Sequence, residues 1–387
     1  MSTTGVRLAG ETGRPRRGAM SGPLLALCLM LLRTDVQAQP EIVSPEVHPD
    51  RTVTFRTQAP QADAVLVKGI EGVEPQPMQK DPMGVWSVTV GPLDPEIYSY
   101  VFEIDGADVV DRHNRWLKTW FSLESQVEVP GDPPLLHEQQ PVPHGAVTHH
   151  IYHSRSVGAQ RGVYVYTPPG YDARRTGGYP MLLLLHGFGD DEGAWTEVGR
   201  AHFIADNLLQ MGRMEEMVIV MPYGHPEPVS ERQFSDQYRE RNLRAMERDV
   251  LQDLFPFISG LYNVSPERTA HAITGLSMGG GHSISIGLGN LDDFAWIGAF
   301  SAAAPTENLD TRFTDLLDDV DAANERLRLL WIACGEDDFL LDENEAFVRW
   351  LRKTSVDHSY EVTEGAHTWF VWRKYLATFL TTIFRDE

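Results

Sequence analysis

A serine flanked by glycines constrains the fold of this chain more than any other feature. Residues 269–282 read T-A-H-A-I-T-G-L-S-M-G-G-G-H, so a short apolar run ends in G-L-S-M-G around Ser277. This pattern is typical of a nucleophile elbow, a strained turn that joins a strand to a helix and places a serine hydroxyl at its tip. Gly275 and Gly279 leave room where a side chain would collide with the turn. The motif therefore predicts a strand, an accessible serine and a helix, in this order.

The sequence on both sides of the elbow alternates between strands and helices. Continuous apolar runs are typical of strands buried on both faces of a parallel sheet. Helical or loop sequence separates each run from the next, which predicts a parallel sheet covered by helices on both faces. In such sheets the reactive groups lie at the carboxyl ends of the strands. The predicted strands of this domain, besides the elbow strand, are 162–166, 181–185, 217–221, 296–300, 327–333 and 360–363, with helices at 199–211 and 243–261.

An acid and a base follow later strands, at the edge where Ser277 is expected. A serine hydroxyl becomes a strong nucleophile when a base takes its proton and a carboxylate orients that base. Glu336, Asp337 and Asp338 share the turn after one predicted strand, and His367 follows the last strand. The order serine, acid, histidine is one of the three chain orders used by catalytic triads. The residues alone leave the choice among the three acids open.

Two other histidines compete with His367 for the role of base. His282 lies on the helix after the elbow, five residues beyond Ser277, where it points away from the position of a base. His358 precedes its predicted strand and therefore lies at the opposite end of the sheet. Only His367 is expected at the correct end.

The N-terminal part of the chain has an all-β pattern. Short alternating runs are separated by turn residues at regular spacing, and no helical period competes with them. We therefore predict four parts: a signal peptide at 1–38, an immunoglobulin-like β-sandwich at 39–130, a Pro-rich linker at 131–150 and the catalytic domain at 151–387. The predicted strands of the sandwich are 52–55, 64–67, 85–90 and 98–104.

The β-sandwich resembles a known kind of carbohydrate-binding module. The segments VTFRTQAP, GVWSVTVGPLDPEIYSYVFEIDG and DRHN are similar to early-set immunoglobulin-like modules related to family-48 carbohydrate-binding modules. This resemblance implies a polysaccharide context. Trp116 and Trp120 could stack on sugar rings or pack against the catalytic domain; both alternatives remain open.

The large domain resembles the esterase-D or feruloyl-esterase type of α/β-hydrolase, carbohydrate esterase family one. The segments that carry the resemblance are VYTPPGY, YPMLLLLHGFGDDEGAWTEVGRA, VMPYGH, GLSMGGG, CGEDDFL and GAHTWFVWRKYL. It implies the α/β-hydrolase fold, with Ser277 as nucleophile, Asp338 as triad acid and His367 as base. Asp337 is the alternative acid. His282 departs from the family pattern, in which glutamine is usual.

An oxyanion hole requires two backbone N–H donors aimed at the carbonyl oxygen as it becomes negative. One is expected from Met278, directly after the nucleophile, and the family pattern implies Phe188 as the other. We also expect His186 and Trp369 to contact the substrate, and Trp372 to pack in the core.

The N-terminus reads as an export signal. Arg14, Arg16 and Arg17 precede the apolar run 23–32, and residues 36–38 form a small-x-small cleavage site. The apolar run is too short to span a bilayer. These features predict a secreted or periplasmic protein.

Charge and cysteine content exclude several classes of partner. The formal net charge is −22 at pH 7, which argues against nucleic acid or an anionic membrane surface as a partner. Of the two cysteines, Cys28 lies in the predicted signal, which leaves Cys334 alone, without a disulfide partner and without a cysteine metal cluster. We expect no metal and no cofactor.

The predicted function is a serine esterase that removes feruloyl or acetyl groups from xylan, so its partner is a polysaccharide or another small ester. The residues themselves predict the ester chemistry, and the resemblance adds the carbohydrate. A siderophore trilactone esterase is the first alternative. The second is a glycan-binding protein without hydrolytic activity, or an acyltransferase, on the same fold.

Overall fold

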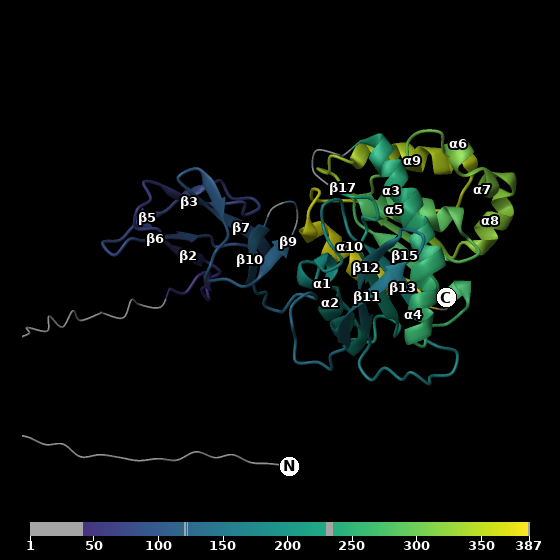
Figure 1. Cartoon of the computed structure of the whole chain (residues 1–387), viewed down its shortest axis with the longest axis horizontal. Helices are drawn as coiled ribbons and strands as arrows, with labels where there is room; N and C mark the ends of the chain where they lie inside the picture. The colour runs from purple at the N-terminus through teal and green to yellow at the C-terminus, as the bar shows by residue number, and fades with distance from the viewer. Residues whose placement is uncertain (1–41, 120, 122, 230–234, 386–387) are drawn as a thin grey trace, which may run out of the picture. The chain divides into compact units, whose positions relative to one another are not determined.

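The computed structural model describes residues 42–385 except 120, 122 and 230–234. The predicted signal peptide, with Cys28, and Trp120 lie outside these residues. The described chain contains an N-terminal β-sheet domain and a larger α/β domain, which Figure 1 shows.

The larger domain is built on an eight-stranded sheet with the order β11-β12-β14-β13-β15-β16-β17-β18. β12 pairs antiparallel with β11 and β14, and the strands from β14 to β18 are parallel. The predicted parallel sheet is thus confirmed, with an antiparallel edge in addition. The strands are β11 (Ala146–Ser154), β12 (Ala159–Thr167), β13 (Met181–Leu185), β14 (Val218–Pro222), β15 (His271–Gly275), β16 (Trp296–Phe300), β17 (Leu329–Gly335) and β18 (Ser359–Thr363).

Helices cover both faces of this sheet, because each central strand is apolar on both sides. In β13, Leu183 and Leu185 belong to one core, whereas Leu182 and Leu184 belong to the other, as the two-residue period of a strand requires. The first core includes residues of α3 (Asp236–Asp249), α4 (Phe255–Leu261), α5 (Met278–Gly289) and α9 (Leu341–Thr354). The second includes residues of α1 (Ala194–Glu197), α2 (Ala201–Gln210) and α10 (Trp369–Thr382). Three short helices, α6 (Leu309–Arg312), α7 (Thr314–Asp318) and α8 (Val320–Arg326), lie between β16 and β17.

The predicted helix at 243–261 begins earlier and is not regular. It starts at Asp236, where the Ser235 side chain accepts a hydrogen bond from the N–H of Tyr238. A π-helical turn, Val250–Leu254, then separates α3 from α4. Pro256 in the first turn of α4 lacks the N–H that would continue the regular pattern.

The N-terminal domain consists of two antiparallel sheets. Their orders are β1-β2-β6-β5 and β4-β3-β7-β10-β9, with β8 paired to β7. Phe55 of the first sheet and Tyr100 of the second lie in one core, with ring centroids 4.6 Å apart. The strands are β1 (Glu46–Val47), β2 (Val53–Gln58), β3 (Val65–Lys68), β4 (Gln76–Pro77), β5 (Gln79–Lys80), β6 (Val85–Val90), β7 (Glu96–Ile104), β8 (Ala107–Val109), β9 (Leu117–Thr119) and β10 (Leu123–Val129).

Polar and aromatic contacts join the β-sheet domain to the larger domain. Trp116 donates from Nε1 to the carbonyl oxygen of Glu197 at 2.9 Å, and the Arg200 guanidinium lies 4.1 Å from its ring centroid. Tyr98 meets Phe370 of α10 edge-on, with centroids 5.2 Å apart. Trp116 therefore packs against the larger domain, which favours the packing interpretation over a sugar platform.

A buried ion pair links the same two domains, and it predicts a large loss of stability on substitution. Arg373 of α10 lies 2.7 Å from Glu96 of β7 and donates to the carbonyl oxygen of Val198. Arg373→Met removes the cation that pairs with the buried Glu96 carboxylate, so we expect the free energy of unfolding, measured in urea, to fall by about 3–5 kcal/mol. The exposed pair of Arg175 with Glu216 is the control, and Arg175→Met is expected to cost less than about 1 kcal/mol. Equal losses in the two variants would contradict this prediction.

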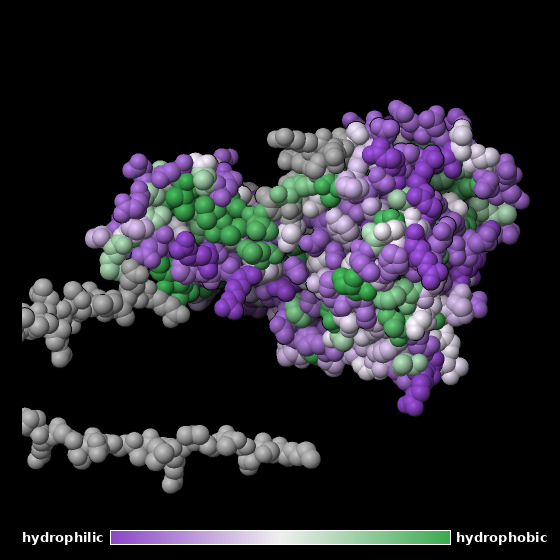
Figure 2. Space-filling model, in the orientation of Figure 1, coloured by the Kyte–Doolittle hydropathy of each residue, from purple (hydrophilic) through white to green (hydrophobic). Residues whose placement is uncertain are grey.

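Hydrophilic side chains cover much of the face of the larger domain in Figure 2, in keeping with the net charge of −22. None of the helices in the described residues is long and apolar enough to cross a membrane.

Candidate active site

The turn between β15 and α5 has the geometry of a nucleophile elbow. Ser277 has a φ of 54°, a left-handed conformation that is strained for a residue with a side chain. A Cβ at Gly275 would lie 2.6 Å from the carbonyl oxygen of Leu185, and one at Gly279 would lie 2.6 Å from that of His186. Both glycines are therefore required for the close approach of β13 to the turn.

The structure brings together the serine, the histidine and one of the three acids. His367 lies with Nε2 3.0 Å from Oγ of Ser277. Its Nδ1 lies 3.0 and 2.9 Å from the two carboxylate oxygens of Asp338. These distances match those of a nucleophile, a base and an acid that orients the base.

The fold distinguishes Asp338 from its neighbours. Asp338 is buried, whereas Glu336 and Asp337 are exposed. One oxygen of Asp338 also accepts the N–H of Leu340 at 2.8 Å. Burial raises the pKa of Asp338, but the hydrogen bond and charge of His367, together with the hydrogen bonds of Leu340 and Ser301, outweigh it, and the net pKa lies below its usual value. Asp338 is therefore held as a carboxylate beside the imidazole.

The competing histidines lie elsewhere. His358 donates from Nδ1 to the carbonyl oxygen of Val356, just before β18 begins. His282 is buried on α5, and its Nδ1 has no hydrogen-bond partner within the described chain. Burial lowers the pKa of His282 to about 3, so its ring is neutral.

The two residues expected to form the oxyanion hole lie beside Ser277. Met278 is the first residue of α5, directly after the serine. Phe188 lies in the loop after β13, where Gly187 comes close enough that a Cβ there would lie 3.5 Å from that of Ser277. Phe188, Met278 and Ser277 line one cavity.

His186 does not lie where a substrate-binding residue is expected. It is 2% exposed, and both ring nitrogens have backbone partners: the carbonyl oxygen of Gly187 at 2.8 Å and the N–H of Gly224 at 2.7 Å. No ring nitrogen remains for a substrate.

The cavity above Ser277 has a volume of about 1610 Å³, and aromatic side chains form part of its wall. Trp369 lines it and packs edge-on against Trp195, with centroids 5.0 Å apart. Trp372, expected only in the core, is buried but also lines the cavity and meets the His367 ring edge-on at 4.9 Å. Phe339 stands beside the same imidazole at 4.4 Å and is 76% exposed.

The β-sheet domain also contributes to the cavity, which sequence reasoning missed. Lys118 of β9 and Glu124 of β10 line it and form an ion pair at 3.2 Å. The ring of Phe121, between these strands, lies 5.1 Å from that of Phe188. Only the packing of two domains brings these residues to the site, so no local motif could have revealed them.

A buried carboxyl group beside Gly187 predicts a pH-dependent stability. Burial raises the pKa of Asp190 to about 7, although the charge of Lys118 lowers it. The unfolded pKa is about 3.9, so the native state holds the extra proton between these values, and stability falls as the pH rises from about 4 to 7. Asp190→Asn is expected to remove this fall, which is on the order of 4 kcal/mol. Urea unfolding across this range measures it.

The exposed Asp342 of α9 is the matched control, because Asp342→Asn should leave the slope of stability against pH unchanged. An Asp190→Asn variant with the wild-type slope would contradict the prediction.

Within the described residues, no group of three or more histidine, cysteine, aspartate or glutamate side chains is placed to hold a metal ion. Cys334 is buried, and burial raises the pKa of its thiol to about 12.

Comparison with known proteins relates this chain to esterases. The family model described as "Putative esterase" matches residues 154–383. The chain is similar to an endo-1,4-beta-xylanase/feruloyl esterase of Xylanibacter ruminicola, with 28% identity over 363 residues. That match covers 90% of this chain and 47% of the relative, so the chain spans about half of the relative's length.

Two further proteins are similar over different lengths of the chain. An acetyl esterase of Caldicellulosiruptor saccharolyticus is 25% identical over 226 residues, which cover 51% of this chain and 80% of that protein. The structure of the enterobactin esterase from Shigella flexneri matches with a TM-score of 0.60 and 19% identity, and covers 87% of this chain and 94% of that one. The structural match extends across both domains and supports the α/β-hydrolase fold with an N-terminal β domain.

Proposed function

The chain belongs to the "Putative esterase" family, and on this premise we propose that it hydrolyses feruloyl or acetyl esters of plant polysaccharide through an acyl-enzyme. The observation that carries the proposal is the contact of His367 with Ser277 at 3.0 Å and with Asp338 at 2.9 Å. A hydroxyl, a base and an orienting carboxylate at these distances constitute the machinery of acyl transfer.

In the first half of the proposed reaction, His367 takes the proton of Ser277 while Oγ attacks the ester carbonyl carbon. Asp338 holds the imidazole with Nδ1–H toward its carboxylate and stabilises the imidazolium that forms. The carbonyl oxygen becomes negative and accepts hydrogen bonds from the N–H groups of Phe188 and Met278. The imidazolium then protonates the alcohol oxygen as the carbon–oxygen bond breaks.

In the second half, water replaces the alcohol. His367 takes a proton from the water, whose oxygen attacks the acyl carbon, and the acid leaves as Ser277 recovers its proton. The strained backbone of Ser277 supports both steps, because it keeps Oγ within reach of the imidazole.

Three features support a polysaccharide ester as substrate. A relative that is similar over 90% of this chain is named as an endo-1,4-beta-xylanase/feruloyl esterase. The cavity of about 1610 Å³ is far larger than an acetyl group requires. The leading segment 1–38, with its predicted export signal, would place the enzyme outside the cytoplasm, where plant polysaccharide is found.

We propose that the β-sheet domain helps to bind the glycan through its edge at Lys118 and Glu124.

Product release from arabinoxylan tests the proposal. The protein is incubated with feruloylated and with acetylated arabinoxylan, and ferulate and acetate are measured separately. Release of either acid supports the proposal, and the ratio of their rates identifies the preferred acyl group. If fluorophosphonate labelled Ser277 but neither acid was released, the polysaccharide substrate would be refuted, and the protein would be a serine hydrolase that acts on a different ester.

A siderophore trilactone is the second candidate substrate. The observation that favours it is the match of both domains to the enterobactin esterase. Hydrolysis of a catecholate trilactone, together with failure to release ferulate or acetate, would favour this alternative.

A further inference from the structure

Two buried imidazoles hold the loop that carries Phe188. His186 donates from Nδ1 to the carbonyl oxygen of Gly187 at 2.8 Å. The N–H of Gly189 donates to Nε2 of His225 at 3.1 Å. The backbone is therefore held on both sides of Phe188.

The contact with Gly187 fixes the direction of the N–H that the oxyanion hole needs. In a trans peptide the carbonyl and the N–H lie in one plane and point in opposite directions. The carbonyl of Gly187 points at the His186 ring, so the N–H of Phe188 points away from it. Rotation of this peptide would lose a buried hydrogen bond and misdirect the donor.

Backbone donors fix the tautomers of both rings. The N–H of Gly224 donates to Nε2 of His186, so its Nδ1 carries the proton that Gly187 accepts. The N–H of Gly189 occupies Nε2 of His225, whose Nδ1 then donates to the hydroxyl of Tyr238 at 2.8 Å. Burial lowers the pKa of His186 to about 4 and that of His225 to about 2, so both rings are neutral at neutral pH.

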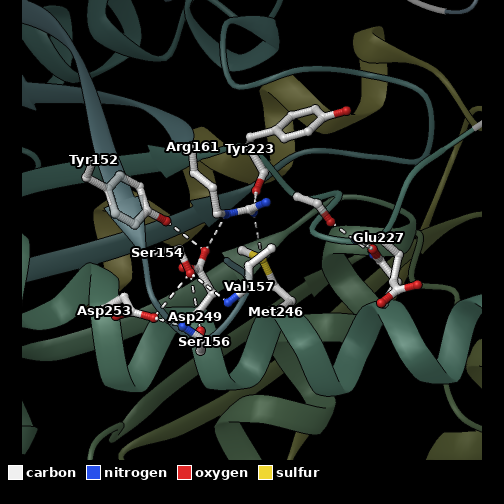
Figure 3. Close-up of polar contacts among 12 residues, drawn as sticks. Tyr152, Ser154, Ser156, Val157, Arg161, Tyr223, Glu227, Met246, Asp249 and Asp253 are labelled. Carbon is white, nitrogen blue, oxygen red and sulfur yellow. Dashed lines mark hydrogen bonds and ion pairs between the residues drawn. The ribbon is translucent and has the colours of Figure 1, made fainter. Parts of the chain in front are cut away.

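The segment 223–225 supplies both Gly224 and His225, and a buried ion pair anchors its start (Figure 3). Arg161 of β12 donates from Nη2 to the carbonyl oxygen of Tyr223 and from Nε to Asp249 at 2.6 Å. Asp249 also accepts the hydroxyl of Tyr152 at 2.7 Å. Arg161 is 4% exposed and Asp249 is fully buried, so neither touches a substrate.

We propose that the Arg161–Asp249 pair positions the oxyanion hole. It fixes the segment 223–225, which fixes the two imidazoles, and these direct the N–H of Phe188. The positioning residues are thus Arg161, His186 and His225. They affect catalysis only through the oxyanion hole, which stabilises the negative charge that develops in the transition state. The inference rests on the proposed acylation of Ser277.

Kinetics of p-nitrophenyl acetate hydrolysis and inhibition by phenylboronic acid test the proposal. The boronate bonds to Ser277 and places an oxygen in the oxyanion position, so it reports that site without turnover. Arg161→Met is expected to lower kcat about 10- to 100-fold with KM changed less than about threefold. The inhibition constant of the boronate should rise by the same factor as kcat/KM falls.

His225 provides a second pair of variants, because one of them can replace both hydrogen bonds. His225→Leu should reproduce the loss in kcat and the weaker boronate binding. His225→Gln has an amide that can accept from Gly189 and donate to Tyr238, and it should recover most of both. If Arg161→Met does not fold, because it leaves Asp249 unpaired, these two variants provide the test by the same criteria.

Arg268 is the matched control. Like Arg161, it donates to a backbone carbonyl oxygen, in this case that of Arg326 at 2.7 Å. It lies just before β15, at the opposite end of that strand from Ser277. Arg268→Met should retain wild-type kcat and boronate inhibition. The proposal would be overturned if Arg161→Met or His225→Leu folded and kept the wild-type kcat. It would also be overturned if either folded variant had a reduced kcat but an unchanged inhibition constant for the boronate. Undiminished turnover by Ser277→Ala would instead refute the proposed function.

Discussion

Ser277→Ala is expected to lower kcat for p-nitrophenyl acetate by about 10⁵- to 10⁶-fold, the largest effect of any single substitution in this chain. The variant removes the hydroxyl oxygen that lies 3.0 Å from Nε2 of His367 and that the imidazole would activate. KM should change little, because the oxyanion donors and the cavity remain. Fluorophosphonate labelling of the wild type, detected on the intact protein, should disappear in the variant.

A matched control separates loss of the nucleophile from damage to the fold. Ser285 lies on α5, about two turns beyond Ser277. Ser285→Ala should retain wild-type labelling and thermal stability. Residual turnover by Ser277→Ala above about 1% of wild type would exclude Ser277 as the nucleophile.

Asp338→Asn is expected to lower kcat by about 10⁴-fold, with little change in stability. An asparagine amide can donate to Nδ1 of His367, and it then stabilises the tautomer in which Nε2 carries the proton. Such an imidazole does not accept the proton of Ser277. The buried position and the two contacts at 2.9 and 3.0 Å are the reason for the size of this effect.

Asp337→Asn is the paired measurement, since this neighbour is exposed and has no contact with His367 among the described residues. Its kcat should stay within about twofold of wild type. A larger loss from Asp337→Asn than from Asp338→Asn would reverse the assignment of the acid.

Local sequence was sufficient for the elements that carry the site. The glycines around Ser277 predict the elbow because their small size matters within one turn. The apolar runs predict the buried strands because burial on both faces imposes a continuous pattern. The position of His367 after the last strand placed it at the correct edge of the sheet, since parallel strands end on the same side.

Sequence did not reveal contacts between distant segments. Asp337 and Asp338 are adjacent, and only the turn after β17 buries one and exposes the other. His186 was expected to contact the substrate, but its ring is buried and accepts a hydrogen bond from the N–H of Gly224, which is 38 residues later in the sequence.

The nucleophile and base could be predicted from sequence, whereas the residues that position the oxyanion hole could not. The residues by themselves predicted a parallel sheet covered by helices, the elbow at Ser277 and the base at His367, because each depends on spacing within one element or on the order of elements. The α/β-hydrolase fold and the choice of Asp338 as the acid came from the resemblance to the feruloyl-esterase type. Only the tertiary structure placed Arg161 against Asp249, 88 residues apart, and Lys118 at the rim of the cavity. Such pairs depend on how layers and domains pack, and a buried charge carries no periodic signal of its partner.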